Sequence, residues 1–362
     1  MNLAIVLGCR PEAIKLAPVV REALRRHWDV TILNTGQHRE LFDQTGFADE
    51  FPVTCLNTPN LGVPEQFVDE ALSRLELWSE DEPERVILVQ GDTASAYAGA
   101  HLAYGINWPL VHLEAGLRTG DHADPFPEEG YRTTIDAWSD LRLAPTPKAL
   151  HVLLNDKHKR ATNVLVGNTV VDALRALQVV PSPAPLRPRV VLVTLHRRES
   201  WGEHLKNIVS GLRSVALETE NRHGYVFRWP AHLSPAVQQE AQRVKDLTAS
   251  TRKGANFRIE PPLEYPRFVR TLAYCKAVVT DSGGVVEEAA TLGVPCVITR
   301  DKTERMEAVE SGQAILAGRT SKGVADAVRQ VLAGQLSSTP SSIFGDGHAA
   351  EASCDAMERA FG

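Results

Sequence analysis

Short apolar runs that alternate with longer helical patterns are the feature that most constrains how this chain can fold. Most of these runs are continuously apolar, which is typical of strands buried on both faces of a parallel sheet. Patterns between them, such as those over 65–78 and 234–247, predict helices. We expect strands in ten segments: 3–8, 30–36, 85–91, 110–116, 141–146, 189–196, 225–232, 257–262, 277–284 and 295–300.

This alternation predicts an α/β protein with two Rossmann-like, doubly wound domains that face a central cleft. A chain of 362 residues is long enough for two domains. The series of elements breaks at a proline-rich segment, 181–189, within a junction over 166–188. We therefore expect an N-terminal domain over 1–168 and a C-terminal domain over 169–345. The helical tail, 346–362, would pack back on the first domain.

Composition narrows the possible partners and compartment. The formal net charge of −6 gives the whole chain no basic attraction for nucleic acid or for a membrane surface. Five cysteines without a CxxC pair indicate reduced thiols in a cytoplasmic protein, with Cys9 and Cys296 as core residues. The apolar start is too short for a signal peptide, and no run approaches a membrane span. We expect neither a nucleic-acid partner nor a membrane partner.

Polar and glycine-rich residues follow several predicted strands, where open α/β sheets bind their ligands. Ser282, Gly283 and Gly284 come between a strand and a helix, so their backbone N–H groups suit a phosphate. The alternative is a serine N-cap with flexible glycines. Glu288, one turn into that helix, could accept from ribose hydroxyls or complement the helix dipole.

Basic residues follow two other strands. Arg10 and Lys15 could meet a diphosphate or be ordinary surface residues, and the missing G-x-G-x-x-G disfavours a nicotinamide cofactor. His196, with two arginines after it, suits a departing diphosphate or a charged turn. Its HxxE spacing with Glu199 has no further metal-ligand pattern beside it, so we expect no metal. The HxE at Glu114 lacks the P-C-x-x-C of zinc deaminases.

Three acids at strand and helix ends are the candidates for proton transfer. Asp92 and Glu114 follow two strands, and Glu128 lies in a helical first turn after Pro127. Each alone could be a turn or capping acid. Carboxylates that share one cleft have pKa values pushed apart, which suits general acid and base work.

Eight motifs occur in one order that closely resembles the bacterial, non-hydrolysing UDP-N-acetylglucosamine 2-epimerases. They are GCRPEAIKLAPVV, TGQHREL, QGDT, HLEAGLRTGD, PFPEEGYR, LHRRES, AHLSP and TDSGGVVEEAATLGVPCVITRDKTERMEAV, and they cover nearly the whole chain. The resemblance implies a glycosyltransferase-B-like fold, a homodimer and no cofactor. It implies that UDP-GlcNAc and UDP-ManNAc are interconverted by elimination of UDP to 2-acetamidoglucal, followed by re-addition.

The resemblance also implies roles for residues that the strand-end argument selects. The catalytic residues would be Asp92, Glu114, Glu128 and His196. Residues that bind UDP or the sugar would be Arg10, Lys15, Arg132, Phe268, Ser282, Gly283, Gly284, Glu288 and Arg305. His38 and His232 would belong to a second site, at which relatives bind an activating UDP-GlcNAc. Glu40 and Glu65 place acids there, so we expect that activation to be absent.

Departures from the family pattern keep alternatives open. Tyr131 stands where asparagine is usual, and Leu195 replaces a small residue before the histidine, so both could reshape the sugar pocket. The substrate could then be a modified UDP-hexosamine. A hydrolysing 2-epimerase would release ManNAc and UDP instead. A glycosyltransferase would leave the EAGLRT motif without a role, and a non-catalytic sugar-nucleotide sensor would not need the three acids.

Overall fold

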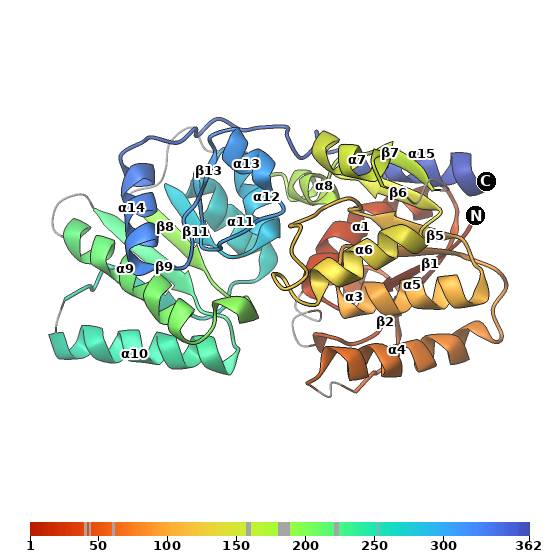
Figure 1. Ribbon diagram of the computed structural model, residues 1–362, viewed down its shortest axis with the longest axis horizontal. Coiled ribbons are helices and arrows are strands. Elements are labelled where there is room, and N and C mark those ends of the chain that lie inside the picture. Colours follow the sequence, from red (N-terminus) through yellow and green to blue (C-terminus); the bar gives the residue numbers. More distant parts are fainter. Residues whose placement is uncertain are drawn as a thin grey trace. The chain divides into compact units, whose positions relative to one another are not determined.

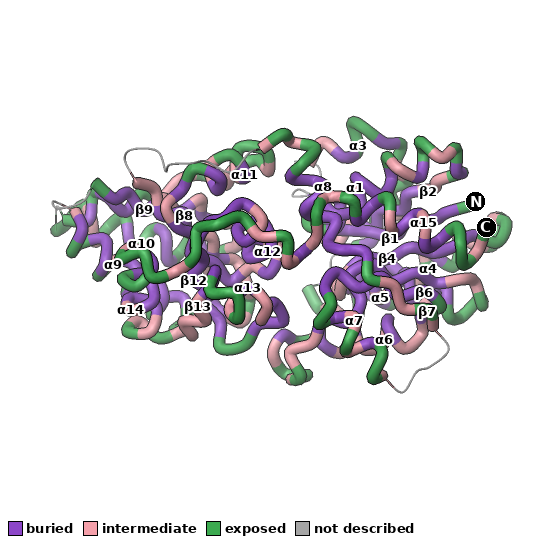
Figure 2. The backbone as a smooth tube through the Cα atoms, turned by 90° about the horizontal axis from the view of Figure 1, so that it is seen from above, coloured by how far each residue is buried: buried purple, intermediate pink, exposed green. Residues whose placement is uncertain are grey.

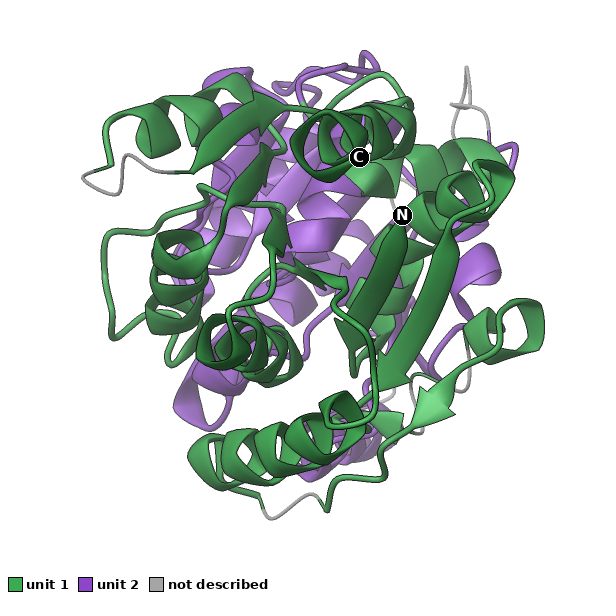
Figure 3. Cartoon of the chain, turned by 90° about the vertical axis from the view of Figure 1, so that its right-hand side faces the viewer, with its two compact units in different colours: residues 1–176, 344–362 green, residues 177–343 purple. Residues whose placement is uncertain are grey.

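The computed structural model describes residues 1–39, 42, 45–59, 62–156, 161–179, 189–220, 224–251 and 253–362. The chain forms two compact units (Figure 3). Unit 1 comprises Met1–Ala176 and Phe344–Gly362, and unit 2 comprises Leu177–Ile343. Glu40 and residues 181–188 of the proline-rich segment lie outside the described residues.

Unit 1 is built on a parallel sheet in the order β3-β2-β1-β4-β5-β6-β7 (Figure 1). Its strands are β1 (Asn2–Leu7), β2 (Asp29–Asn34), β3 (Thr54–Cys55), β4 (Val86–Gln90), β5 (Leu110–Leu113), β6 (Leu141–Ala144) and β7 (Thr162–Leu165). Its helices are α1 (Arg10–Arg25), α3 (Phe47–Glu50), α4 (Pro64–Ser79), α5 (Ala94–Ile106), α6 (Glu128–Trp138), α7 (Pro147–Leu154), α8 (Thr169–Ala176) and α15 (Ala349–Phe361). The strand order reverses direction between β1 and β4.

Helices cover both faces of the unit 1 sheet, because alternate residues of each strand point to opposite sides. Leu3 and Ile5 of β1 belong to a core with buried residues of α1 and α15. Ala4 and Val6 belong to a second core with buried residues of α4 and α5. The C-terminal helix thus completes the core of unit 1 although it ends the chain.

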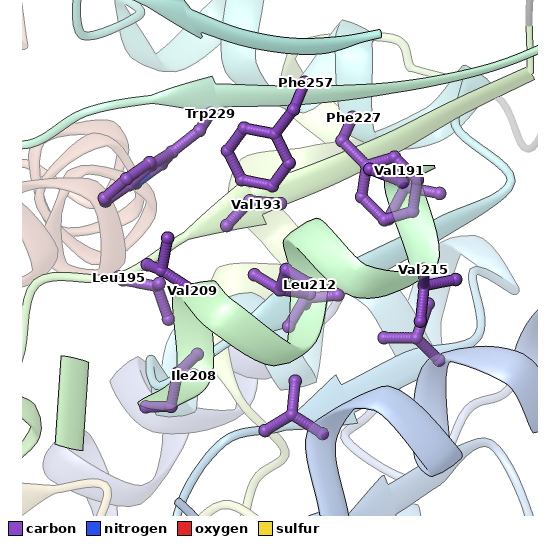
Figure 4. Packing of buried hydrophobic residues seen from close by; sticks show 14 of the residues in the cluster. Val191, Val193, Leu195, Ile208, Val209, Leu212, Val215, Phe227, Trp229 and Phe257 are labelled. Carbon is purple, nitrogen blue, oxygen red and sulfur yellow. The ribbon is translucent and has the colours of Figure 1, made fainter. Parts of the chain in front are cut away.

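Unit 2 repeats this topology with the order β10-β9-β8-β11-β12-β13. Its strands are β8 (Arg189–Thr194), β9 (Tyr225–Pro230), β10 (Phe257–Glu260), β11 (Ala277–Thr280), β12 (Cys296–Ile298) and β13 (Ala314–Leu316). Its helices are the 3-10 turn η1 (Arg198–Ser200), α9 (Glu203–Thr219), α10 (Pro235–Thr251), α11 (Tyr265–Tyr274), α12 (Gly283–Leu292), α13 (Met306–Glu310) and α14 (Ser321–Leu332). Figure 4 shows Phe227, Trp229 and Phe257 packed with aliphatic residues of β8 and α9.

The predicted α/β class is confirmed, because both sheets are parallel and their strands are largely buried (Figure 2). All ten predicted strands are present, and β3, β7 and β13 were missed. Among the described residues, none of the helices is both long enough and apolar enough to cross a bilayer.

Candidate active site

Each sheet places some of the predicted site residues at its switch point, where the strand order reverses. In unit 1 the turns after β1 and β4 carry Arg10 and Asp92. In unit 2 the turns after β8 and β11 carry His196 and Ser282. The carboxyl ends of these strands are the edge at which open α/β sheets generally bind their ligands.

Glu114 directly follows β5 and is buried among polar partners. Its Oε2 atom lies 2.6 Å from Lys15 Nζ of α1, and the two side chains are 6% and 7% exposed. Gln90, the last residue of β4, also donates to Glu114 Oε2. A Cβ atom placed on Gly91 would lie 4.0 Å from the same oxygen. Glu114 therefore lies at the adjoining ends of β4 and β5, beside the turn that carries Asp92.

Asp92 pairs with Arg132 of α6 rather than capping the helix that follows it. The N-cap of α5 is Thr93, whose side chain accepts a hydrogen bond from Ala96 N. Arg132 donates to Asp92, and its Nη1 atom lies 3.1 Å from Glu129 Oε2. The Arg132 side chain is therefore fixed between two carboxylates of unit 1.

Glu128 is the first residue of α6, and its backbone position follows the prediction. Tyr131 lies in the next turn and stacks on Tyr97 of α5, with ring centroids 4.5 Å apart. Burial, with a smaller effect from the charges of Glu65 and Glu128, raises the pKa of Tyr131 to about 12. The Tyr131 hydroxyl thus stays protonated at neutral pH, and its ring packs toward α5.

Glu12 is a buried acid that the sequence analysis did not select. Its Oε2 atom accepts hydrogen bonds from Gly8 N and Cys9 N at 2.8 and 2.9 Å, and its Oε1 atom accepts one from Thr93 Oγ1 at 2.6 Å. Burial raises the pKa of the carboxyl, although these hydrogen bonds oppose the rise. Glu12 joins the turn after β1 to the turn that carries Asp92.

His196 of unit 2 lies against Asp281 at the end of β11. The backbone N–H groups of His196 and Arg197 donate to the Asp281 carboxylate at 3.0–3.1 Å. The His196 Nδ1 atom is 3.3 Å from Asp281 Oδ1, and 40% of the side chain is exposed. The ring of His232 lies 5.9 Å from that of His196, so these two predicted residues are neighbours.

The turn at the start of α12 is covered by the side chain of Arg305. Ser282 is the N-cap, but among the described residues its side chain makes no capping hydrogen bond with the first turn. Arg305 Nε donates to Glu287 at 2.8 Å, and its Nη1 donates to Glu304. A Cβ atom on Gly283 would lie 2.7 Å from Arg305 Cζ. A side chain at 283 would therefore have to displace this guanidinium.

Glu288 of α12 accepts a hydrogen bond from Tyr265 of α11 at 2.9 Å and is buried. Phe268 follows Tyr265 by three residues in α11, so the two aromatic side chains share one helix face. Unit 2 thus has three candidate contacts for a nucleoside, which are Tyr265, Phe268 and Glu288. Tyr265 was not among the predicted residues.

The residues of the predicted second site lie in different units. His38 is an exposed residue of unit 1 whose N–H donates to Gly8 O at 2.8 Å, and His232 belongs to unit 2. Glu65 is exposed in the first turn of α4, whereas Glu40 is outside the described residues. Leu195 is buried in the unit 2 core, with the aliphatic residues of α9 around it (Figure 4).

Several supporting residues escaped prediction because each resembles an ordinary structural residue in the sequence. In unit 1 they are Glu12, Gln90, His112, Glu129 and Asp136, and in unit 2 they are Tyr265, Asp281, Glu287 and Glu304. The helical spacing of Glu129, Arg132 and Asp136 could have indicated that these three charged side chains share one face of α6. Over the described residues, His, Cys, Asp and Glu side chains form no group of three or more that could hold a metal ion.

Comparison with known proteins gives a match along nearly the whole chain. Residues 22–358 match the UDP-N-acetylglucosamine 2-epimerase family. The UDP-N-acetylglucosamine 2-epimerase of Bacillus subtilis strain 168 is 35% identical over 365 residues, which cover 96% of this chain and 93% of that protein. Such relatives are isomerases by name.

Solved structures agree with this match. The UDP-GlcNAc 2-epimerase of Neisseria meningitidis, solved with UDP-GlcNAc bound, has a TM-score of 0.87 at 30% identity and covers 99% of this chain and 100% of that one. The calicheamicin glycosyltransferase CalG4 has a TM-score of 0.59 at 15% identity and covers 100% of this chain and 99% of that one. At that identity the likeness shows only the glycosyltransferase-B-like fold.

Proposed function

Because this chain belongs to the UDP-N-acetylglucosamine 2-epimerase family, we propose that it is a non-hydrolysing epimerase that interconverts UDP-GlcNAc and UDP-ManNAc. The observation that carries the proposal is the group of carboxylates at the ends of β4 and β5. Glu114 and Asp92 are each paired with a cation of unit 1, Lys15 and Arg132 respectively. These pairs place both carboxylates beside a cation at the edge of the sheet where open α/β folds bind ligands.

The reaction needs acids and bases because the C2 proton of the sugar has no neighbouring carbonyl to acidify it. In the first step a carboxylate takes the C2 proton, the C1–O bond breaks, and its electron pair leaves with UDP. A C1=C2 double bond remains in 2-acetamidoglucal. In the second step an acid returns a proton to C2 from the other face, and a UDP phosphate oxygen forms the C1–O bond again. Both steps depend on general acid–base catalysis.

Within unit 1 we assign the proton transfers to Asp92, Glu114 and Glu128. The ammonium of Lys15 would stabilise the charged form of Glu114, because an opposite charge at hydrogen-bond distance favours ionisation. Lys15 would thus serve the acid/base group rather than the diphosphate. Arg132 would orient Asp92 and stay near the sugar, and Arg10 at the start of α1 would meet a phosphate oxygen.

Within unit 2 we assign nucleotide binding to the start of α12 and the residues around it. The N–H groups at Ser282, Gly283 and Gly284 suit phosphate oxygens. Arg305, held by two carboxylates, and His196, backed by Asp281, would stabilise the negative charge that UDP gains as it leaves. Glu288 would accept from the ribose, and Phe268 would pack on the uracil.

UDP-GlcNAc itself is the substrate that we favour over a modified hexosamine. The argument for a modified sugar depends on Tyr131 and Leu195. Leu195 is a core residue, and the Tyr131 ring stacks on Tyr97 of α5. Neither contact supports a change in the sugar pocket. We also expect a hyperbolic dependence of rate on UDP-GlcNAc, because Glu65 is an exposed acid that would repel a second diphosphate.

We further propose a cytoplasmic homodimer. All five cysteines are free thiols, which suits a reducing compartment. An aromatic and aliphatic surface at the C-terminal ends of α4 and α5 would form the interface. The candidate residues are Leu77 of α4 and Tyr104 of α5, which are 66% and 61% exposed, and Trp138 of α6, whose ring stacks on Tyr104 with centroids 5.0 Å apart. Exposed apolar patches of this kind are typical of protein–protein contacts.

The test is proton NMR of UDP-GlcNAc incubated with the purified protein in D2O. The proposed reaction produces UDP-ManNAc that carries deuterium at C2. Free ManNAc and UDP would instead assign the chain to the hydrolysing branch, and a lack of turnover would contradict the proposed substrate.

Substitutions then test the assigned roles. Asp92→Asn and Glu114→Gln should each lower the rate of deuterium incorporation by about 100-fold or more, because each removes an acid/base group. Their affinity for UDP, measured by calorimetry, should stay close to that of the wild type. A matched loss of UDP affinity would contradict the division of roles between the units.

A further inference from the structure

Asp136 is a buried acid in the third turn of α6 that none of the roles above uses. Its side chain is fully buried, and both oxygens accept hydrogen bonds. Oδ1 lies 2.6 Å from His112 Nδ1, and Oδ2 accepts from Gly116 N at 3.2 Å and from Arg118 Nη2 at 2.6 Å. The acid thus binds three residues of the segment that contains Glu114.

His112 carries this connection to a second turn. The residue is fully buried on β5, and its Nε2 atom lies 2.8 Å from Gly91 O. One ring nitrogen thus faces the Asp136 carboxylate and the other faces a backbone carbonyl oxygen. Gly91 directly precedes Asp92. One imidazole therefore connects Asp136 with the turn that holds Asp92.

The charge state of Asp136 agrees with this geometry. Burial alone would raise the pKa of its carboxyl, but the charges and hydrogen bonds of His112 and Arg118 outweigh burial and lower the pKa below its ordinary value. The Asp136 carboxyl is therefore ionised near neutral pH.

Asp136 contacts residues on both sides of Glu114 in the sequence. His112 lies two residues before Glu114, and Gly116 lies two residues after it. Between them Glu114 has a φ of 72°, a left-handed conformation that is unfavourable for a residue with a side chain. Backbone strain of this kind persists only where the surroundings hold it, and it is concentrated at functional sites.

We propose that Asp136 and His112 are positioning residues that hold the backbone turns of Glu114 and Asp92 in place for proton transfer. The proposal rests on the proposed function, since it concerns the acid/base groups assigned there. Two carboxylates on separate strand ends need a fixed separation to serve one sugar carbon, and a shift of about 1 Å can cost about 100-fold in rate. Neither Asp136 nor His112 needs to touch the substrate.

A purely structural role is the competing explanation, because breaking a buried ion pair destabilises proteins in general. Asp172 of α8 offers a matched control for this. It is also a buried acid of unit 1 whose carboxylate accepts backbone hydrogen bonds, here from Ala349 N at 3.2 Å and Ala350 N at 2.9 Å. Its contacts hold the C-terminal helix rather than an acid/base turn.

The experiment compares Asp136→Asn with Asp172→Asn in the full-length protein. Both variants should unfold at a lower temperature than the wild type. Only Asp136→Asn should lower kcat for UDP-GlcNAc epimerisation, by about 100-fold, while KM and UDP affinity change less than about threefold. Equal kcat values for a folded Asp136→Asn variant and the wild type would overturn the proposal, as would an equal kcat loss in both variants.

Two further measurements keep the test decisive. If Asp136→Asn does not fold, His112→Gln takes its place, because a glutamine amide has one donor nitrogen in place of the two ring nitrogens that contact Asp136 and Gly91. Hydrogen exchange, followed by mass spectrometry, then reports on residues 110–119 without any turnover. Faster exchange there in the Asp136 or His112 variant, and not in Asp172→Asn, supports the positioning role even if UDP-GlcNAc proves not to be the substrate. Unchanged exchange there would overturn it.

Discussion

Lys15 Nζ lies 2.6 Å from Glu114 Oε2, although 99 residues separate the two along the chain. The contact joins α1, which follows the first strand of unit 1, to the end of β5. Both side chains are almost completely buried, so neither charge has access to bulk water for compensation. The pair therefore links a proposed acid/base group to the packing of the first helix.

Replacing Lys15 with methionine should lower both stability and activity. Removal of one partner leaves a buried carboxylate without its nearest cation, which costs about 3 kcal/mol or more. The double variant Lys15→Met/Glu114→Gln should recover much of the free energy of unfolding, because it removes the other charge as well. It should remain inactive. Urea unfolding and the NMR assay measure the two effects, and purely additive losses of stability would contradict direct pairing.

Gly116→Ala should be among the most damaging small substitutions in unit 1. Gly116 has a φ of 87°, and an added Cβ atom would lie 2.4 Å from Ala149 O. We expect a loss of about 3 kcal/mol in the free energy of unfolding. Gly130→Ala in α6 is the matched control, since a Cβ atom there meets no atom within 4 Å. It should be neutral or stabilise by up to about 1 kcal/mol. Equal effects in urea unfolding would contradict this reading of the turn.

The stability contributed by Glu22 should decrease in acid. Hydrogen bonds and charge from Arg25 and Arg26 lower the pKa of Glu22 to about 2, from an ordinary value of 4.5. A folded-state pKa below the unfolded value gives stability that is fully present above pH 4.5 and lost as the pH falls through 2. The penalty of Glu22→Gln, measured by urea unfolding, should therefore shrink between about pH 7 and about pH 3. A penalty independent of pH would contradict the ion pairing.

Leu77→Glu should dissociate the proposed dimer. Leu77 is 66% exposed near the end of α4 and is one of the residues proposed for the interface. A buried carboxylate at an interface is costly, so the variant should sediment as a monomer. Leu154→Glu is the control, because Leu154 of α7 is 64% exposed and lies outside that surface. Analytical ultracentrifugation decides, and a dimer that persists in Leu77→Glu would place the interface elsewhere.

The sequence predicts the interior of both sheets better than their edges. Strands β1, β4, β8 and β11 are apolar runs because neighbours and helices cover them on every side. The strands that were missed, β3, β7 and β13, all lie at sheet edges. Thr54 and Cys55 of β3 are exposed, so no apolar run marks them. β10 is also an edge strand, but its buried Phe257 gave a signal.

Within the candidate site, the sequence predicts the residues at strand ends but not the buried residues that hold the neighbouring turns in place. Asp92 and Glu114 follow apolar runs directly, so their place at the ligand-binding edge follows from the topology. Glu12 and Glu129 look like ordinary first-turn acids in the sequence, and Asp136 looks like a solvated residue of an amphipathic helix. Their burial depends on which face of each helix meets the sheet edge, and only the tertiary structure determines that.

Gly283→Ala should weaken nucleotide binding through Arg305. The added Cβ atom would lie 2.7 Å from Arg305 Cζ, and Glu287 and Glu304 hold that guanidinium in place. Displacement of Arg305 should raise the dissociation constant for UDP, measured by calorimetry, by about 10-fold or more, the value of one charged hydrogen bond. In an Arg305→Ala background the same glycine substitution should have little further effect, because its target is already gone. If the two losses simply add, Gly283 acts on the nucleotide independently of Arg305, and the close approach of this side chain is not what the glycine accommodates.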